Sequence, residues 1–389
     1  PSTWPVAAGQ DDAWAPRWSP DGEKVAYLSD RGLHLFDMAE GESRLLVERS
    51  DDYIRAHAWS PDGRRLAFVA SVQEDGIWDR GVHVVDLSSG DVSLVALGSE
   101  PAWGADSMSL ALQASGQTLE EARRGIRDGR PGLHLTDTFT HDMQLLVPGE
   151  ASEPRLSSSG AWVVFWRHAA HEEGEWEEGE WSDPAEFAET VLEGGADSVG
   201  SASRALDNEA AARMREAGGA SLQGPEWWPR VNLFAVSSSG GDEVVLTSDG
   251  VSCAPRWDPR AERIHFLRPS EEDPEAATMW SVRPDGSGLE RITTKPFRTV
   301  NPETAWLTPD RKRVVYERSV EDADVMAEVI ARTAGTDIYL RKTSGGKARR
   351  LGNRHAFKKA FVLSPEGDRL AYEVLNPDTE RREIWVLEL

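Results

Sequence analysis

One short phrase recurs along the chain and constrains its fold more than any other feature. WSPDG occupies residues 18–22 and again residues 59–63, and each time an alternating apolar run follows, KVAYLS and then RLAFVA. Weaker versions of the same turn bring the number of copies to seven. Most copies are separated by about the length of one four-stranded propeller blade, and one interval is about twice as long. The copies begin at Arg17, Ala58, Ala102, Arg155, Arg256, Trp306 and Val362.

The runs that follow each turn have the composition of β-strands. They are short, rich in Val, Ile, Leu, Tyr and Trp, and bounded by Gly, Pro, Asp and Ser. With the segment before each turn counted as strand a, every unit has strands a, b, c and d, except that the seventh lacks strand d. The N-terminal TWPVAA can supply that strand and close a ring, which removes exposed edges. The sequence therefore predicts an all-β fold, a single seven-bladed β-propeller over residues 1–389, with blades that start near residues 15, 56, 100, 153, 254, 304 and 360.

The repeated phrase itself is predicted to be structural. Ser19-Pro20-Asp21-Gly22 fits a type I turn with a bulge, because Pro presets φ at the second position and Gly accepts a positive φ at the fourth. The large side chains of Trp18 and Trp59 can pack between neighbouring blades. The phrase therefore identifies the a–b turns of the scaffold, and function is expected on the opposite face.

Composition excludes several classes of partner. The net charge of −24 argues against nucleic acid and anionic membrane surfaces, and the chain has no uncharged apolar run of the roughly 18 residues that a membrane span needs. Cys253, the single cysteine, is predicted to be a small buried side chain. The opening PSTWPVAAGQ has neither an initiator Met nor an apolar leader, so a leader has been removed or the chain was trimmed. A periplasmic or extracellular location is expected, with a cytoplasmic one left open.

The units WSPDG…VAYLS…LHLFD and MWSVRPDGSGLERIT resemble the WD40-like repeat of the TolB family, which also builds the N-terminal propellers of prolyl-oligopeptidase and dipeptidyl-peptidase proteins. The resemblance covers essentially the whole chain and implies a propeller, more often exported than cytoplasmic. The peptidases need an α/β-hydrolase domain with a G-x-S-x-G elbow, and the sequence contains no such motif. The dipeptidyl-peptidase propellers carry an acidic pair on a helical insertion, and HAAHEEGEWEEGEW at 168–181 does not reproduce that motif.

The connections between strands b and c vary most in length, with long ones at 71–81, 114–132, 168–230, 268–278 and 319–336. In a propeller the b–c and d–a connections emerge on one face, so recognition is expected there. The insertion at 168–230 has two predicted helical segments and carries 15 acidic residues against four Arg, a local charge near −11. Such a charge favours cationic ligands, metal ions or a partner with a basic surface.

The insertion also holds aromatic and metal-ligating residue types. Its tryptophans either anchor the loop on the propeller or offer a flat surface to a partner. His168, His171 and Glu172 are weak metal candidates, because their spacing matches neither H-E-x-x-H nor H-x-x-E-H, and a solvated acidic loop is the alternative. No cofactor is predicted, and a divalent cation is left open. The four tryptophans are Trp176, Trp181, Trp227 and Trp228.

A second set of candidates surrounds the predicted mouth of the central channel. Arg17, Arg155 and Arg256 occupy the same position of strand a in three blades and can form a partial ring that binds a carboxylate or phosphate. Alternatively, each arginine pairs with an acidic residue of its own or the adjacent blade. The full set of channel-mouth candidates is Asp12, Trp14, Arg17, Arg55, His57, Glu153, Arg155, Arg256, Glu303 and His355.

The leading functional hypothesis is a non-catalytic recognition or scaffold propeller, a monomer that binds a protein or peptide with a basic surface through the long b–c loops and the acidic insertion. The alternative is an enzyme at the channel mouth, a lyase or hydrolase acting on saccharides or peptides. A third hypothesis is a propeller that gates substrate access to a separate peptidase. Whether Arg55, His57 and His355 converge on one pocket distinguishes the enzyme from the binding module.

Overall fold

The computed structural model describes residues 2–8, 11–48, 54–74, 77–117, 121, 129–169, 228–273, 275–319, 336–351, 358–376, 379 and 381–389. Several predictions lie outside these ranges. They are the two helical segments of the 168–230 insertion and the residues His171, Glu172, Trp176, Trp181, Trp227 and His355.

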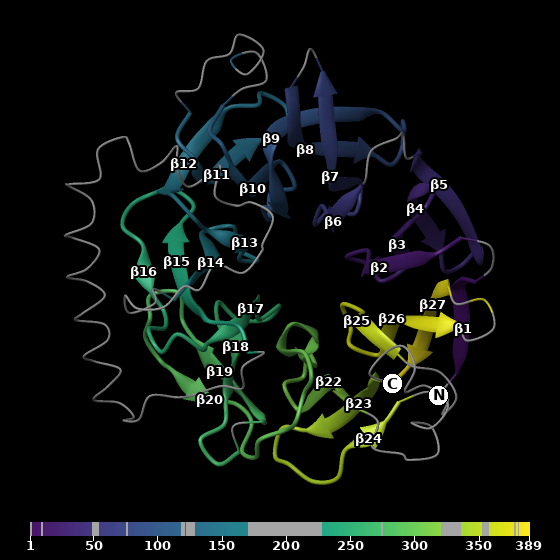
Figure 1. Cartoon of the computed structure of the whole chain (residues 1–389), viewed down its shortest axis with the longest axis vertical. Helices are drawn as coiled ribbons and strands as arrows, with labels where there is room; N and C mark the ends of the chain where they lie inside the picture. The colour runs from purple at the N-terminus through teal and green to yellow at the C-terminus, as the bar shows by residue number, and fades with distance from the viewer. Residues whose placement is uncertain are drawn as a thin grey trace, which may run out of the picture.

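Antiparallel sheets stand around a central axis as the blades of a β-propeller (Figure 1), which confirms the all-β propeller architecture. Five of the sheets have four strands each. These are β2–β5 (Ala13–Trp18, Lys24–Ser29, Gly32–Asp37, Glu42–Glu48), β13–β16 (Ser152–Leu156, Trp162–His168, Val231–Ser237, Val244–Val245), β17–β20 (Cys253–Trp257, Ile264–Pro269, Ala277–Val282, Glu290–Arg291), β21–β24 (Trp306–Leu307, Arg313–Ser319, Thr336–Lys342, Arg349–Arg350), and β25–β27 (Lys358–Leu363, Arg369–Asn376, Arg381–Glu388) with β1 (Thr3–Ala7).

The remaining sheet has seven strands in the order of the chain. Its strand β9 is 12 residues long; its first part pairs with β8 and its second part with β10. One strand thus ends one set of four strands and begins the next. The seven strands are β6 (Arg55–Trp59), β7 (Arg65–Glu74), β8 (Ile77–Asp86), β9 (Val92–Trp103), β10 (Ser109–Ala114), β11 (Gly132–Asp137) and β12 (Met143–Pro148).

The N-terminal strand closes the ring, as the sequence predicts. β1 pairs with β27 antiparallel, with Thr3 opposite Leu387 and Trp4 opposite Val386, so the two ends of the chain lie side by side (Figure 1). A polar clasp strengthens the junction with the next sheet. The Asp12 carboxylate accepts bonds from the backbone N–H and the guanidinium of Arg382, and that guanidinium lies 4.6 Å from the ring of Trp14.

The WSPDG turns have the predicted geometry. Gly22 has φ +70° and its N–H donates to the Ser19 carbonyl, while the Lys24 N–H donates to Ser19 Oγ at 2.9 Å. The turn that begins at Ser60 repeats these contacts with Gly63 at φ +70°. Gly is required because other residues rarely adopt positive φ. The phrase is therefore a turn signal, as expected.

The tryptophan of the phrase joins neighbouring sheets, which confirms the predicted packing role. Each indole N–H donates a hydrogen bond to a backbone carbonyl of the preceding innermost strand. This bond satisfies a carbonyl that would otherwise need a water molecule as its partner. The four bonds run from Trp18 to Val362 (3.3 Å), Trp59 to Arg17 (3.2 Å), Trp103 to Ala58 (3.0 Å) and Trp257 to Arg155 (2.7 Å).

The core lies between the sheets. In one cluster Leu28 and Leu33 of the β2–β5 sheet pack against Leu66 and Phe68 of the next sheet, and all four are nearly inaccessible to water. Burial of such side chains contributes roughly 1.5–3 kcal/mol each. The stability of the disc therefore comes mainly from contacts between blades.

One of the predicted b–c loops is in fact largely strand, and a second is shorter than expected. The connection expected at 71–81 is a hairpin extension, because β7 continues to Glu74 and β8 begins at Ile77, with Ser71 opposite Arg80. The connection at 268–278 is shorter than expected, since β18 ends at Pro269 and β19 begins at Ala277. The described ranges include one short 3₁₀ helix, η1 (Pro302–Thr304). No helix in these ranges has both the length and the apolar character that crossing a membrane requires.

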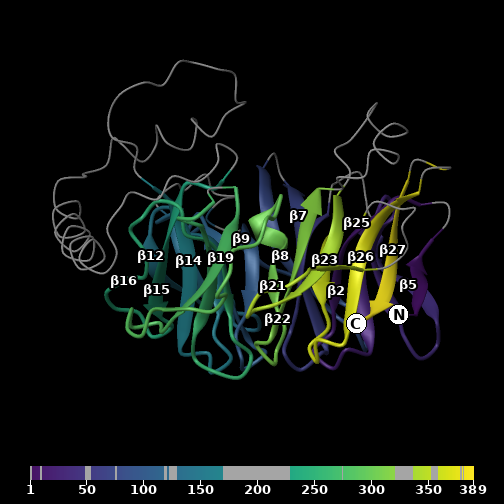
Figure 2. The same ribbon diagram turned by 90° about the horizontal axis from the view of Figure 1, so that it is seen from below.

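The two faces of the disc differ in which connections they carry. The a–b turns and c–d connections emerge at one face, and η1, which belongs to a d–a connection, lies toward the other (Figure 2). The innermost strands β2, β6, β13, β17 and β25 surround the axis (Figure 1). Residues on these strands are therefore the ones that can line the central channel.

Candidate functional site

The innermost strands share a backbone irregularity that presents polar groups near the axis. Each has a bulge with a residue at positive φ, and in several the N–H of that residue donates to a glutamate of a neighbouring sheet. These bonds are Ala15 to Glu373 (2.9 Å), Glu153 to Glu100 (2.6 Å) and Ala360 to Glu317 (2.6 Å). The positive-φ residues are Ala15, Ala56, Glu100, Glu153, Ala254 and Ala360.

The three arginines predicted to form a partial ring do occupy one register. Arg17 lies opposite Ala26, Arg155 opposite Val164, and Arg256 opposite His265, each two residues after a bulge. Burial, with a smaller contribution from the charges of Arg155 and Arg17, lowers the pKa of Arg256 to about 9 against the opposing effect of Glu303. Burial and the charge of Arg155 likewise lower the pKa of Arg17, although water still reaches its side chain. The charge of Arg155 thus acts on both Arg17 and Arg256.

The arginines are only partly neutralised by direct partners. Arg155 pairs with Glu153 of its own strand at 3.0 Å, as the alternative interpretation predicts. Arg17 donates to the Pro16 carbonyl, and Arg256 donates to the carbonyl of Glu303. Among the residues that the structure describes, neither Arg17 nor Arg256 has a carboxylate within ion-pair distance. The buried Nε atoms of Arg155 and Arg256 have no hydrogen-bond partner there.

Two carboxyl groups beside the arginines have unusual acidities. Burial raises the pKa of Glu303, and the negative charge of Glu153 raises it further. Burial also raises the pKa of Glu100, against the bond that this carboxylate accepts from the Glu153 N–H. The channel thus combines cationic groups that can hold an anion with two carboxyl groups whose pKa is raised.

The other channel-mouth candidates lie in different surroundings. His57 is 5% exposed and lies between sheets, with Nε2 3.4 Å from the Ala26 carbonyl, and burial together with Arg17 lowers its pKa to about 3. It is a neutral interface residue that does not face the channel mouth. Asp12 and Trp14 belong to the clasp with Arg382. The side chain of Arg55 is exposed, whereas that of His57 is buried.

Two candidate residues of the insertion, Trp228 and His168, lie within the described ranges. Trp228 is 2% exposed and donates to the Val251 carbonyl at 2.7 Å, so it lies in the core and cannot present a surface to a partner. His168 Nδ1 lies 2.6 Å from Glu150, and its ring meets the edge of Trp166. No group of three or more potential metal ligands occurs among the described residues. Cys253 is buried, as predicted, and burial raises the pKa of its thiol.

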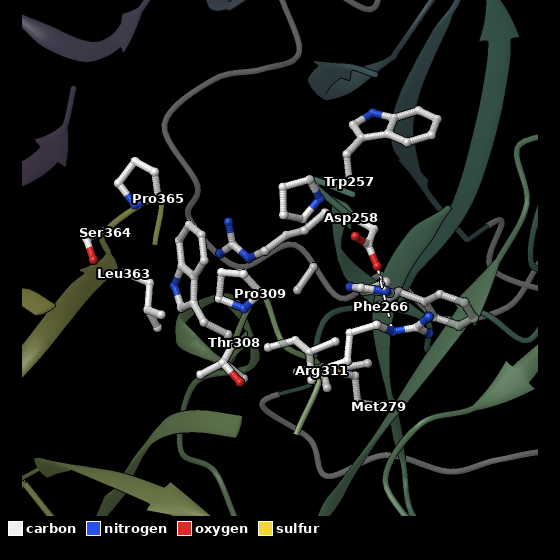
Figure 3. Close-up of a pocket in the computed structure, with 18 residues that line it drawn as sticks. Trp257, Asp258, Phe266, Met279, Thr308, Pro309, Arg311, Leu363, Ser364 and Pro365 are labelled. Atoms are coloured by element: carbon white, nitrogen blue, oxygen red, sulfur yellow. Dashed lines mark ion pairs between the residues drawn. The ribbon is translucent and has the colours of Figure 1, made fainter. Parts of the chain in front are cut away.

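A cavity of about 250 Å³ lies between the β17–β20 and β21–β24 sheets and extends to β25 (Figure 3). It opens among three a–b turns, on the face opposite to the one expected to be functional. The sequence prediction missed it because its walls come from three separate repeats. Its apolar walls include Trp257, Pro259, Phe266, Leu267, Met279, Ala305, Trp306, Leu307, Pro309, Leu363 and Pro365, and its polar lining is Arg256, Asp258, His265, Thr308, Arg311 and Ser364.

Comparison with solved structures finds several propellers of similar shape. An oligogalacturonate lyase from Vibrio parahaemolyticus matches with a TM-score of 0.62 and 12% identity, over 99% of this chain and 93% of that one. An oligogalacturonate lyase in complex with manganese matches with 0.58 and 12%, over 100% and 97%. The propeller domain of the Trilobed protease from Pyrococcus furiosus matches with 0.58 and 13%, over 97% and 96%.

No protein-family model matches the sequence, and comparison with curated proteins finds no significant match. The manganese belongs to the lyase structure. Two of the residues predicted as weak metal candidates, His171 and Glu172, lie outside the described ranges. At such low identity these likenesses show the propeller fold of the chain.

Proposed function

We propose that the chain is a seven-bladed propeller that binds an anionic ligand in its central channel. The count of seven treats the seven-stranded sheet as two four-stranded blades that share β9, which the pairing of β9 with β8 and with β10 supports. The sequence repeat supports the same count, since two turn copies, at Ala58 and Ala102, fall within this sheet.

The observation that carries the proposal is the shared register of Arg17, Arg155 and Arg256 on the innermost strands, where the charge of Arg155 contributes to the lowered pKa of both Arg17 and Arg256. An anion near them would offset this positive charge, and the buried Nε atoms of Arg155 and Arg256 have no hydrogen-bond partner among the described residues. Guanidinium groups match carboxylate geometry better than a lysine does. A carboxylate-bearing ligand is therefore the best fit.

A saccharide that contains uronate units is the first candidate ligand. The oligogalacturonate lyases match this chain over nearly the full length of both proteins, and each unit of an oligogalacturonate carries one carboxylate. A peptide with a free carboxylate is the second candidate, supported by the match to a protease propeller.

Titration calorimetry with oligogalacturonate and with an uncharged oligogalactose of equal length tests the proposal. We expect only the charged saccharide to bind, or a short peptide with a free C-terminus to bind in its place. Arg155→Gln and Arg256→Gln should each weaken binding about tenfold or more, because a hydrogen bond between charged groups contributes roughly 1.5–3 kcal/mol. Arg298→Gln is the control, since Arg298 pairs with Asp273 on the surface. Equal binding of charged and uncharged ligands, or undiminished binding by both channel variants, would refute an anion site.

A saccharide lyase or hydrolase is a second candidate function, and the raised pKa of Glu100 and of Glu303 beside the arginines favours it. Incubation with oligogalacturonate should then release unsaturated products that absorb ultraviolet light, or new reducing ends. Binding without either product would identify a recognition protein.

The partner with a basic surface remains a separate proposal. The charge near −11 of residues 168–230 supports it. Deletion of residues 172–226 should abolish capture of a basic partner, and unchanged affinity after the deletion would rule out this surface. An exported location and a monomeric state are predictions that fractionation and light scattering can check.

A further inference from the structure

We propose a second binding site in the cavity between the β17–β20 and β21–β24 sheets, which takes a small, neutral, mainly apolar molecule that carries a hydroxyl or amide group. The ligand proposed here is neutral and mainly apolar, whereas the ligand proposed for the channel is an anion. Its evidence is a set of departures from the repeat that meet at one point.

The repeat supplies an internal reference for strand b. His265 lies opposite Ser281 in the β17–β20 sheet. At the same position the other strands b carry a small apolar residue that faces an apolar residue of strand c. These pairs are Ala26–Leu35, Ala67–Val84, Ala111–Leu135, Val164–Ala235, Val315–Leu340 and Ala371–Val386. A polar pair has thus replaced an apolar one in this sheet alone.

The adjoining turns depart from the repeat as well. Asp258 occupies the place that Ser19, Ser60 and Ser364 have in other turns. Arg311 occupies the place of Gly22 and adopts φ +58°, which is strained for a residue with a side chain. Such strain persists only where something else favours the residue.

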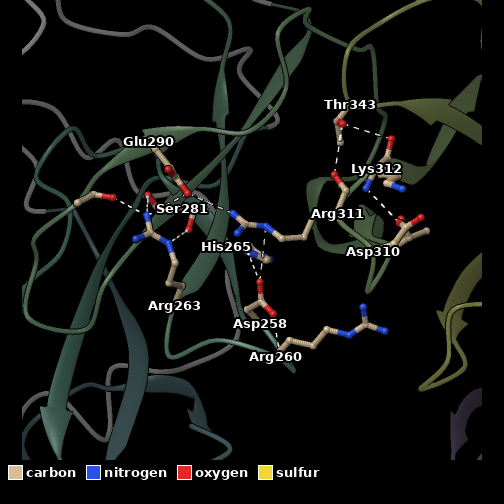
Figure 4. Close-up of polar contacts among 12 residues, drawn as sticks. Asp258, Arg260, Arg263, His265, Ser281, Glu290, Asp310, Arg311, Lys312 and Thr343 are labelled. Atoms are coloured by element: carbon tan, nitrogen blue, oxygen red, sulfur yellow. Dashed lines mark hydrogen bonds and ion pairs between the residues drawn. The ribbon is translucent and has the colours of Figure 1, made fainter.

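These three departures lie in contact (Figure 4). Asp258 Oδ2 is 3.2 Å from His265 Nε2 and 3.7 Å from Arg311 Nε. Arg311 also pairs with Glu290 at 3.2 Å, and Glu290 with Arg263 at 3.3 Å. The strained turn therefore places the guanidinium of Arg311 beside the buried carboxylate of Asp258 in the neighbouring sheet.

The polar atoms in the cavity wall are incompletely satisfied. Asp258 is 2% exposed and His265 is 7% exposed, and both line the cavity. Asp258 Oδ2 and His265 Nε2 are close but not aligned for a hydrogen bond, and neither atom has a hydrogen-bond partner in the part of the chain that the structure describes, although Asp258 Oδ2 also pairs with Arg311. Buried polar atoms of this kind are normally satisfied by protein, water or ligand.

The surrounding charges select a neutral ligand. Asp258 and Glu290 offset Arg311, and Arg256 stacks 3.8 Å over the ring of Trp306 while donating to the Glu303 carbonyl. A hydroxyl or amide can donate to Asp258 and accept from His265, whereas an extra charge would meet a like charge nearby. The cavity of about 250 Å³ is at the small end of ligand pockets and has room for one ring or a short chain.

The test uses saturation-transfer NMR on the full chain with benzyl alcohol and benzamide as probes, and benzoate and benzylamine as charged counterparts. We expect the neutral probes to bind and the charged ones to bind at least about tenfold more weakly. Asp258→Ser and His265→Ala restore residues used by other blades, and each should weaken binding of the neutral probes about tenfold. Ser60→Ala, in the equivalent turn of another blade, is the matched control.

A further variant separates loss of the site from loss of the fold. Ala305 is 3% exposed and lines the cavity, so Ala305→Leu fills the space, keeps both polar residues and should abolish binding. Thermal unfolding checks that each variant is folded. The proposal would be overturned if neither neutral probe bound the wild-type protein or if the charged probes bound equally well. Full binding of the neutral probes by the Asp258 and His265 variants would also overturn it.

Discussion

Histidine side chains in this protein serve packing more than chemistry. His34 stacks on Tyr27 with ring centroids 4.9 Å apart, and His83 stacks on Phe68 at 5.3 Å. Burial lowers the pKa of both imidazoles. Both occur in the similar runs GLHLFD and GVHVVD, so a repeat alignment alone indicates that they are structural. A histidine outside that pattern, such as His265, therefore requires a separate explanation.

Acid should destabilise the protein through His57. Its pKa in the folded state is lowered from 6.5 to about 3, so unfolding takes up a proton and stability is lost as the pH falls through that interval. In His57→Gln the free energy of unfolding should fall less between pH 7 and pH 4. The wild-type loss from this group amounts to roughly 4 kcal/mol at most by pH 3.

Urea denaturation at both pH values measures this difference, with the exposed His141→Gln as the control. Identical pH dependence in wild-type protein and His57→Gln would show that His57 is not the group that takes up the proton.

At the scale of the strand, the sequence predicts turns and registers within one repeat, but it does not predict side-chain contacts between repeats. The turn at Ser19–Gly22, the tryptophans and the arginine register follow from residues a few positions apart. The Asp258–His265 contact spans one hairpin and could have been found by comparing RWDPRAERIHFLR with RWSPDGEKVAYLS. Arg311 comes from the next sheet, and its contact depends on how two sheets pack, which no spacing in the sequence encodes. The position of His57 between two sheets likewise depends on how the sheets pack.

Removal of β1 should open the ring. Without residues 1–7, β27 loses its partner strand and presents an unpaired edge, and the buried Val6 leaves its core cluster. We expect the midpoint of thermal unfolding to fall by about 5 °C or more. Addition of a synthetic peptide of residues 1–8 should recover part of the loss in a concentration-dependent way. An unchanged midpoint after the deletion would show that β1 does not stabilise the ring.

The whole molecule carries a large excess of negative charge. A net charge of −24 favours solubility and opposes compactness through self-repulsion. The channel arginines lie inside this field, so they add a cationic centre to an acidic disc. An anionic ligand of the kind proposed would approach against the overall charge and be held only at short range, which would favour selectivity for ligands that reach the channel.

Added salt should therefore stabilise the fold. Raising sodium chloride from about 0.01 M to 0.5 M shortens the screening length from roughly 30 Å to under 10 Å. We expect the thermal midpoint to rise by a few degrees, because repulsion among like charges exceeds the contribution of exposed ion pairs. Differential scanning fluorimetry across the salt series measures it. A midpoint that falls steadily with salt would show that the ion pairs dominate.

Strand β9 has a consequence for how the molecule comes apart. Residues Val92–Trp103 hydrogen-bond to β8 at one end and to β10 at the other, so neither neighbouring group of strands can open without disturbing the other. Elsewhere in the described chain, neighbouring sheets contact one another through packed side chains and isolated hydrogen bonds. Amide protons of β6–β12 should therefore exchange as one cooperative block, slower than the flanking sheets. A continuous strand makes two blades a single unit of unfolding.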